Sequence, residues 1–310
     1  MSVLLHLTSY AAVLVFAIAI AARYWRIRHY PINLRWEIYP VPHEGKRAAH
    51  GGSRMEDSEY WTHDDPPDRM RELRFMIPEM IFIKGLFDHN RKLWYPSFSF
   101  HFGLYLTFAF GCLLLLGTIL GLTGVQVAEP GAAGPVILLN SLTAVVGVVG
   151  LILTILGGLG LLAMRLSDPE LKPYTNGSHV FNLLFIIGTM ALMLAALSGA
   201  DSHLVPLRAY LTDLLTLNLT GPVADPLTGL AVAAISLLVA YIPLTHMSHF
   251  FVKWFTWHRI RWDDEPNVRG GRIEVMIQQA LNYPVSWPAD HIKGDGKKTW
   301  ADVATEEIQK

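Results

Sequence analysis

Five long apolar segments limit the folds open to this chain more than any other feature. Each is about 20 residues or longer, the length that an α-helix needs to cross roughly 30 Å of hydrocarbon. They cover residues 3–22, 96–122, 136–163, 179–197 and 226–252. Only 16% of the residues are charged, whereas soluble domains are about 25% charged. The sequence therefore predicts an all-α integral membrane protein with five transmembrane helices.

Polar stretches divide the chain around these helices. The first apolar segment is followed, not preceded, by its positive charges, so we expect an uncleaved anchor rather than a signal peptide. A helical periodicity over 69–87 predicts one helix inside the long polar insert. The third apolar segment is rich in glycine, which favours close helix packing. The predicted parts are a first transmembrane helix at 1–22, an insert at 23–95, a four-helix transmembrane core at 96–256 and a tail at 257–310.

The distribution of positive charge predicts the orientation of the helices. Of the 25 Lys and Arg residues, only Arg208 falls in the connections after the second and fourth apolar segments. Basic residues concentrate in the cytoplasmic connections of membrane proteins. We therefore expect the N-terminus outside and the C-terminus in the cytoplasm, with a cytoplasmic insert between helices one and two and a cytoplasmic tail.

The chain has a single cysteine, Cys112, inside an apolar segment. One cysteine excludes an internal disulfide, a Cys-ligated iron–sulfur cluster and covalent haem attachment through C-x-x-C-H. A redox centre in this chain would have to use histidine, methionine or a non-covalent cofactor.

Two histidines lie inside the fifth apolar segment. We expect one uninterrupted helix to pass through His246 and His249 and to leave the membrane near Lys253. At about 1.5 Å per residue, His249 would lie about 6 Å and His246 about 10 Å deeper than Lys253. Their i, i+3 spacing would put both on one helix face. Polar groups at that depth cost several kcal/mol unless they find partners.

His101 lies in the second apolar segment, about five residues from its predicted start. The second and fifth helices would run antiparallel, which brings His101 to nearly the depth of His249. Two neutral imidazoles opposed across a planar macrocycle are the usual way in which a helical bundle holds haem b. We therefore expect His101 and His249 to ligate haem iron, with His246 as an alternative ligand or as a hydrogen-bond partner of a haem propionate.

Three other histidines lie near the predicted membrane surfaces. His179 begins the fourth segment on the cytoplasmic side, whereas His6 and His203 lie near the outer side. A histidine at a membrane boundary is often simply an interfacial polar residue, and this interpretation applies to all three.

Short motifs in the apolar segments resemble the haem b membrane subunits of the respiratory nitrate reductase gamma-subunit family. They are FHFGLYL, which opens the second segment, and IPLTHMSHF, which closes the fifth. Longer motifs resemble the cytochrome b subunit of transmembrane electron-transfer complexes in sulfate-reducing and related bacteria, and the similar subunit of the sulfite-reduction-associated complex. These motifs are RWEIYPVPHE, MIFIKGLFDHNRKLWYPSFSFHFGLYL and RWDDEPN.

The resemblance implies a haem b protein of a bacterial cytoplasmic membrane. The family has a proline six residues before its haem-ligating histidine, which here corresponds to Pro243 and His249, and His101 matches the ligand in the second segment. The resemblance also implies two exchange partners, a cytoplasmic iron–sulfur subunit of the heterodisulfide-reductase type and a periplasmic multihaem cytochrome c. Exchange with menaquinol is a further part of the predicted function, although no motif in the sequence marks a quinone site.

The nitrate reductase subunits bind a second haem with another pair of histidines, one in the second segment and one in the fifth. At the corresponding positions this chain has Gly111 and Ala231, which cannot bind iron. A second haem would need His6 with His203 on the outer side, or His179 with His246 on the inner side. Both pairs remain open, as does a single haem.

The predicted function is that of a b-type cytochrome, the membrane subunit of a respiratory electron-transfer complex. Lys253, Arg259 and Arg261 are predicted to neutralise haem propionates and to face an acidic partner surface. Two alternatives need no cofactor. In one the histidines relay protons along a transport path, and in the other the chain is a structural anchor for soluble subunits.

Overall fold

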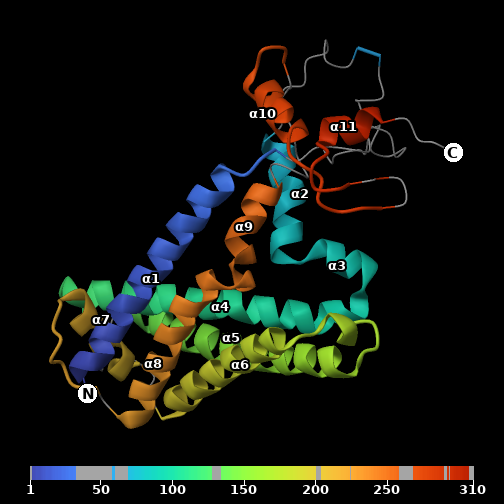
Figure 1. Ribbon diagram of the computed structural model, residues 1–310. Helices are drawn as coiled ribbons and strands as arrows, with labels where there is room; N and C mark the ends of the chain where they lie inside the picture. Colours follow the sequence, from blue (N-terminus) through green and yellow to red (C-terminus); the bar gives the residue numbers. More distant parts are fainter. Residues whose placement is uncertain are drawn as a thin grey trace. The chain divides into compact units, whose positions relative to one another are not determined.

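The computed structural model shows a helical protein with five helices long and apolar enough to cross a membrane (Figure 1). These are α1 (Ser2–Arg28), α4 (Arg91–Leu122), α5 (Gly134–Ser167), α6 (Gly177–Ser198) and the segment Pro226–Leu244, which contains α8 (Pro226–Tyr241). The structure describes residues 2–32, 58–59, 69–127, 134–199, 204–223, 225–257, 268–289, 292 and 294–306. Within these ranges there is no β-strand. The predicted all-helical architecture, with five helices of spanning length, is confirmed for the described residues.

The chain divides into two compact units. The first comprises Met1–Ile20 and Pro78–Met247, and the second comprises Ala21–Ile77 and Ser248–Lys310. The first unit therefore contains most of α1 and all of the other spanning segments.

Helices α4 and α5 approach each other closely because glycines face the neighbouring backbone. A Cβ atom on Gly157 would lie 2.3 Å from the backbone nitrogen of Phe100, and one on Gly103 would lie 2.4 Å from that of Thr154. Real Cβ atoms do not come this near to backbone, so a larger residue would push the two helices apart. The predicted close packing of the glycine-rich third segment is confirmed.

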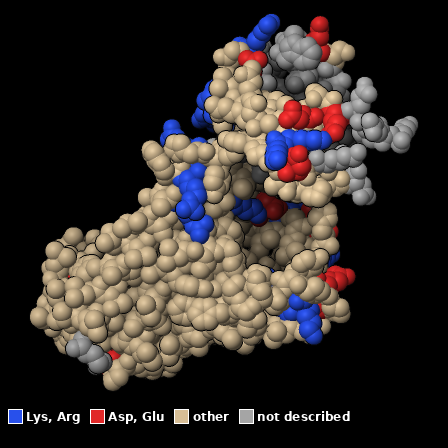
Figure 2. Space-filling model, viewed as in Figure 1, with Lys and Arg blue, Asp and Glu red and all other residues tan. Residues whose placement is uncertain are grey.

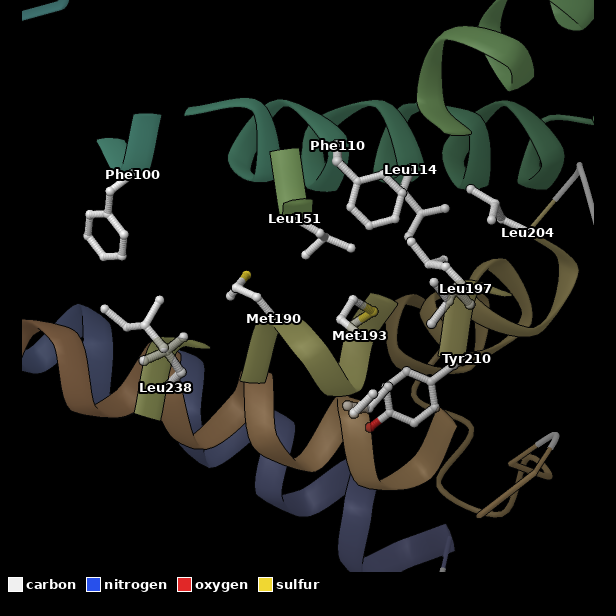
Figure 3. Packing of buried hydrophobic residues seen from close by; sticks show 14 of the residues in the cluster. Phe100, Phe110, Leu114, Leu151, Met190, Met193, Leu197, Leu204, Tyr210 and Leu238 are labelled. Carbon is white, nitrogen blue, oxygen red and sulfur yellow. The ribbon is translucent and has the colours of Figure 1, made fainter. Parts of the chain in front are cut away.

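Apolar side chains from α4, α5, α6, α8 and the short helix α7 (Val205–Leu215) form one core. In sequence order, α4 packs on α5, α5 on α6, and α6 on α8, while α7 packs on α4. Figure 3 shows Phe110 of α4, Leu151 of α5 and Met190 of α6 pointing into this shared core. Tyr210 of α7 and Leu238 of α8 belong to the same cluster.

The outer surface of the first unit is apolar over a wide area. Leu4 and Val13 of α1, Phe108 of α4 and Leu138 of α5 are all strongly exposed. Figure 2 shows this surface as a broad area with almost no Lys, Arg, Asp or Glu. Soluble proteins rarely expose apolar patches of such extent, so lipid is the surrounding that this surface fits.

Charged side chains of the first unit gather where α4 begins and α5 ends. There the ammonium of Lys92 lies 3.5 Å from the carboxylate of Asp168. We call this end the basic end, after the residues Lys84, Arg91, Lys92, Arg165 and Lys172. The helices α1 and α8 begin at the opposite end, where the Ser2 hydroxyl donates to the carbonyl of Gly221.

Arg208 is the basic residue that the sequence places in a connection expected to lie outside the membrane, away from the other Lys and Arg residues. It is buried near this opposite end. Its guanidinium donates to the carbonyl of Leu114 on α4 at 3.3 Å and to the side-chain oxygen of Asn140 on α5 at 3.0 Å. A buried cation is tolerated only when its hydrogen bonds are made inside the protein. Gly117 provides the room, since a Cβ there would overlap the guanidinium.

The predicted helix over 69–87 is interrupted, so a single helix there was wrong. The structure has α2 (Arg69–Ile81) and α3 (Lys84–His89), separated by Phe82 and by Ile83, which is in the left-handed region at φ 52°. The turn is held by the backbone N–H of Gly85, which donates to the carboxylate of Glu79 at 2.7 Å. The indole of Trp94 also donates to the carbonyl of Phe82 at 2.8 Å.

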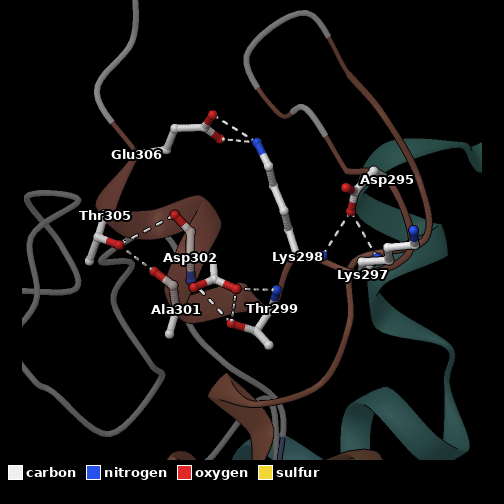
Figure 4. A network of polar contacts seen from close by, with 8 residues as sticks. All are labelled: Asp295, Lys297, Lys298, Thr299, Ala301, Asp302, Thr305 and Glu306. Carbon is white, nitrogen blue, oxygen red and sulfur yellow. Dashed lines mark hydrogen bonds and ion pairs between the residues drawn. The ribbon is translucent and has the colours of Figure 1, made fainter.

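The C-terminal part of the second unit contains α10 (Arg272–Leu281) and α11 (Trp300–Thr305). A capping box opens α11: the Asp302 carboxylate accepts from the backbone N–H and the hydroxyl of Thr299, both at 2.8 Å. Lys298 pairs with Glu306 at 2.8 Å. Figure 4 shows these contacts, together with Asp295, which accepts from the backbone N–H groups of the two lysines after it.

The fifth predicted helix is also interrupted, and this corrects the placement of its histidines. Helix α8 ends at Tyr241, short 3₁₀ turns cover Ile242–Leu244 and His246–Ser248, and α9 (His249–Thr256) begins after them. Pro243 cannot donate a helical hydrogen bond, and Thr245 is extended at φ −111° and ψ −177°. His246 and His249 therefore do not share the face of one continuous helix, and the depths expected from helical rise are wrong.

Candidate functional site

The imidazole of His101 is held in one orientation by its own helix. It lies half-buried on α4, and its Nδ1 is 2.7 Å from the carbonyl oxygen of Ser97, one turn earlier. A carbonyl can only accept, so Nδ1 carries the proton and the lone pair of the neutral ring lies on Nε2. Metal-ligating histidines usually have their second nitrogen fixed in this way. The Ser97 hydroxyl, 3.5 Å from the same nitrogen, adds a polar neighbour.

A second histidine cluster lies toward the basic end of the first unit. The side chain of Asn182 on α6 accepts a hydrogen bond from the Tyr241 hydroxyl at 2.7 Å, and its amide nitrogen lies 3.4 Å from Nε2 of His246. His179 takes part in the capping of α6, where its Nδ1 accepts from the backbone N–H of Asn176 at 3.4 Å. The structure thus connects His179 and His246 through α6 and the turn after α8.

The rings of His179 and His246 are too close to hold a macrocycle between them. Their centroids are 5.2 Å apart and their planes are at 89°, an edge-to-face contact. Two axial ligands must instead be separated by the plane of the haem. This arrangement disfavours His179 with His246 as a ligand pair and supports a hydrogen-bonding role for His246.

His6 is fully buried near the opposite end of the first unit, unlike an interfacial histidine. Its Nδ1 lies 2.9 Å from the carbonyl oxygen of Ser2, so this nitrogen also carries the proton. Its Nε2 is buried and has no hydrogen-bond partner among the residues that the structure describes. The ring of Tyr210 packs against the imidazole with centroids 4.6 Å apart.

The remaining predicted site residues lie in the second unit or outside the described residues. His249 is exposed at the start of α9, and Lys253 is half-buried on the same helix. His203, Arg259 and Arg261 lie outside the described residues. The pairing of His101 with His249, which belong to different units, stays a prediction.

Sequence reasoning missed the partners of these histidines. Asn182 and Tyr241 carry no motif, and only the contact between α6 and the end of α8 brings them to His246. A serine stands four residues before both His6 and His101, and on a helix this spacing brings its hydroxyl near the imidazole. Only the hydroxyl could be inferred from this pattern, because any residue at that position would offer its backbone carbonyl.

No protein-family model matches the chain, and no curated protein matches it closely enough to identify a relative.

Proposed function

We propose that this protein is a b-type cytochrome, the membrane subunit of a respiratory electron-transfer complex. The observation that carries the proposal is the His101 imidazole, fixed through Nδ1 on a carbonyl inside a membrane-spanning helix. A neutral imidazole held this way within apolar sequence suits haem iron better than it suits a solvent-exposed role. The motifs around His101 and His249, which resemble those of haem b membrane subunits, support the same proposal.

In this proposal His101 and His249 would hold the haem iron. The 2.7 Å hydrogen bond to Ser97 keeps the His101 ring in one tautomer and one orientation. Lys253, one turn after His249 on α9, and Arg259 are placed in sequence to neutralise propionates. His246 is the alternative ligand or the propionate partner, already close to Asn182. Haem b would supply a centre that takes up and releases one electron at a time, without covalent attachment.

The charge distribution supports an orientation and a set of partners. The basic end of the first unit would face the cytoplasm under the positive-inside rule, and the N-terminus would lie outside. An iron–sulfur subunit of the heterodisulfide-reductase type would dock against the cytoplasmic insert and tail. A periplasmic cytochrome c, menaquinol or both would exchange electrons at the opposite end. The protein would then be the electron-transfer subunit of a membrane oxidoreductase in a bacterial cytoplasmic membrane.

A proton relay is the second candidate, and one observation favours it. Tyr241, Asn182 and His246 form a connected polar chain toward the basic end, and His179 contacts it. Such chains of hydroxyl, amide and imidazole groups can pass protons without any cofactor. This candidate predicts a colourless purified protein.

The test is a reduced-minus-oxidised absorbance spectrum with pyridine-haemochrome quantitation on the purified full-length protein. Wild type would be compared with His101→Ala, His249→Ala and the control His29→Ala, whose exposed ring lies beyond α1. We expect haem b in wild type and in the control, and loss of one haem in each of the other two variants. A folded wild-type protein without haem would overturn the proposal and favour the relay or a structural anchor.

A further inference from the structure

The end of α2 is bound to α4 through two side chains that donate to its backbone carbonyls. The indole of Trp94 donates to the carbonyl of Phe82, and the hydroxyl of Tyr105 donates to the carbonyl of Met80, both at 2.8 Å. The last carbonyls of a helix find no partner within it and need water or a side chain. Here a membrane-spanning helix of the same unit supplies both donors, which suits a helix end in a region poor in water.

Tyr105 also indicates how deep this end of α2 lies. Counted back from Leu122, the last residue of α4, the roughly 20 residues that cross the hydrocarbon begin near Gly103. Tyr105 therefore lies just inside the hydrocarbon. Side chains on a helix tilt toward its N-terminus, so the hydroxyl of Tyr105 points back to the boundary. The carbonyl of Met80, which accepts from this hydroxyl, lies at that boundary.

Aromatic rings extend the contact along α4. Trp94 stacks on Phe98 with ring centroids 4.8 Å apart, and Phe98 stacks on Phe102 at 5.4 Å. The ring of Phe82 stacks on Phe98 at 6.3 Å, and the residue is still 51% exposed. The adjacent Ile81 is exposed as well. Aromatic residues concentrate where headgroups meet acyl chains, and an exposed apolar pair beside them fits the same layer.

Basic side chains flank this apolar pair. Lys84 pairs with Asp88 and remains exposed, and the Lys92 side chain is exposed at the start of α4. The guanidinium of Arg91 lies 4.4 Å over the ring of Phe87. Long basic side chains near the ends of spanning helices reach up to the lipid phosphates. Apolar residues with basic residues beside them are typical of a segment that lies in the plane of the membrane surface.

We propose that residues 78–90 lie in the boundary between the lipid headgroups and the acyl chains, on the side of the basic end. Phospholipid, rather than a protein partner, covers the exposed surface of Ile81 and Phe82. The sequence places these residues in a polar insert expected to be cytoplasmic, so the edge of the membrane-embedded part moves from residue 96 back to residue 78. The inference goes beyond the proposed function and does not depend on a haem.

The experiment measures how well oxygen and a water-soluble nickel chelate reach a nitroxide spin label on the full-length protein in lipid nanodiscs. Oxygen concentrates among acyl chains and the chelate in water, so the ratio of their effects on power saturation reports depth. Cys112, the single cysteine, is replaced by Ala. The test variants are Phe82→Cys and Ile81→Cys. The references are Phe108→Cys, strongly exposed on α4, and Glu170→Cys, exposed in the turn after α5.

We expect oxygen to act more strongly than the chelate on labels at Phe82, Ile81 and Phe108, and the chelate to act more strongly at Glu170. The ratios at Phe82 and Ile81 should fall between the two references, because the boundary is shallower than the middle of the membrane. Size-exclusion chromatography establishes that each labelled variant is folded. Two test positions keep the measurement decisive if one variant misfolds.

Two results would overturn the inference. Ratios at Phe82 and Ile81 equal to the ratio at Glu170 would place the segment in water. Labels that neither reagent reaches would show that protein, and not lipid, covers this surface. Either result is independent of the haem content of the protein, so failure of this inference is distinguishable from failure of the proposed function.

Discussion

The packing of α4 on α5 predicts a strong effect of adding one methyl group at Gly157. Its Cβ would lie 2.3 Å from the backbone nitrogen and 2.7 Å from the Cα of Phe100, about 1 Å short of ordinary contact. Backbone cannot rotate away, so the two helices must separate along this seam. Overpacking of a tight interior costs about 1–3 kcal/mol. The helix propensity of alanine offsets little of this, because membrane helices stay helical when they come apart.

We therefore expect Gly157→Ala to destabilise the protein by about 2 kcal/mol. Gly111→Ala is the matched control, since a Cβ on this α4 residue would meet nothing within 4 Å. The control should change the free energy of unfolding by less than about 0.5 kcal/mol. The assay is equilibrium unfolding in detergent micelles followed by tryptophan fluorescence, which responds to the separation of helices that stay helical. Equal stability of the two variants would refute the packing argument, as would a Gly157→Ala protein as stable as wild type.

Two further predictions concern polar groups. Asn182→Leu removes the acceptor of the Tyr241 hydroxyl and the amide beside His246, and should cost about 1–3 kcal/mol in the same unfolding assay; an unchanged midpoint would contradict it. In the second unit, the backbone N–H and the hydroxyl of Thr299 hold the pKa of Asp302 below its ordinary value. Because the folded pKa is lowered, this cap stabilises α11 fully above about pH 4 and is lost as the pH falls through the lowered value. The protection of the α11 amides, measured as the exchange rate relative to that of an unstructured peptide at the same pH, should fall over that acidic range in wild type but not in Asp302→Asn, and an equal response of both would count against the cap.

The spanning helices could be predicted from the sequence because membrane insertion depends on local composition. An apolar segment of sufficient length must pair its backbone within itself, whatever its neighbours are. The glycines of α5 could be predicted for a related reason, since only small residues permit close contact without a hydrophobic driving force between helices. Both inferences needed no knowledge of which helix packs on which.

The interruption after α8 could not be predicted from apolar composition. Residues 226–252 are predominantly apolar, so hydropathy alone continues the helix. Pro243 removes one donor, and the hydroxyl of Thr245 then bonds the carbonyl of Ile242 at 3.1 Å and accepts from the N–H of Met247 at 3.2 Å. These local bonds replace helical ones at the point where the two histidines lie. In the sequence, the proline at 243 and the threonine two residues later were the signal that the helix would be interrupted here.

The burial of His6 could not be predicted, because it depends on residues far away in the chain. His6 is the fifth residue of α1 and would lie at a membrane surface if only its own helix were considered. Helix α7, which is too short to be a span, covers it with Tyr210 and ties the neighbouring Ser9 across 201 positions. His6 is thus buried because a second helix, α7, covers the position that α1 alone would leave at the membrane surface. The surroundings of this imidazole are therefore set by α7 as much as by α1.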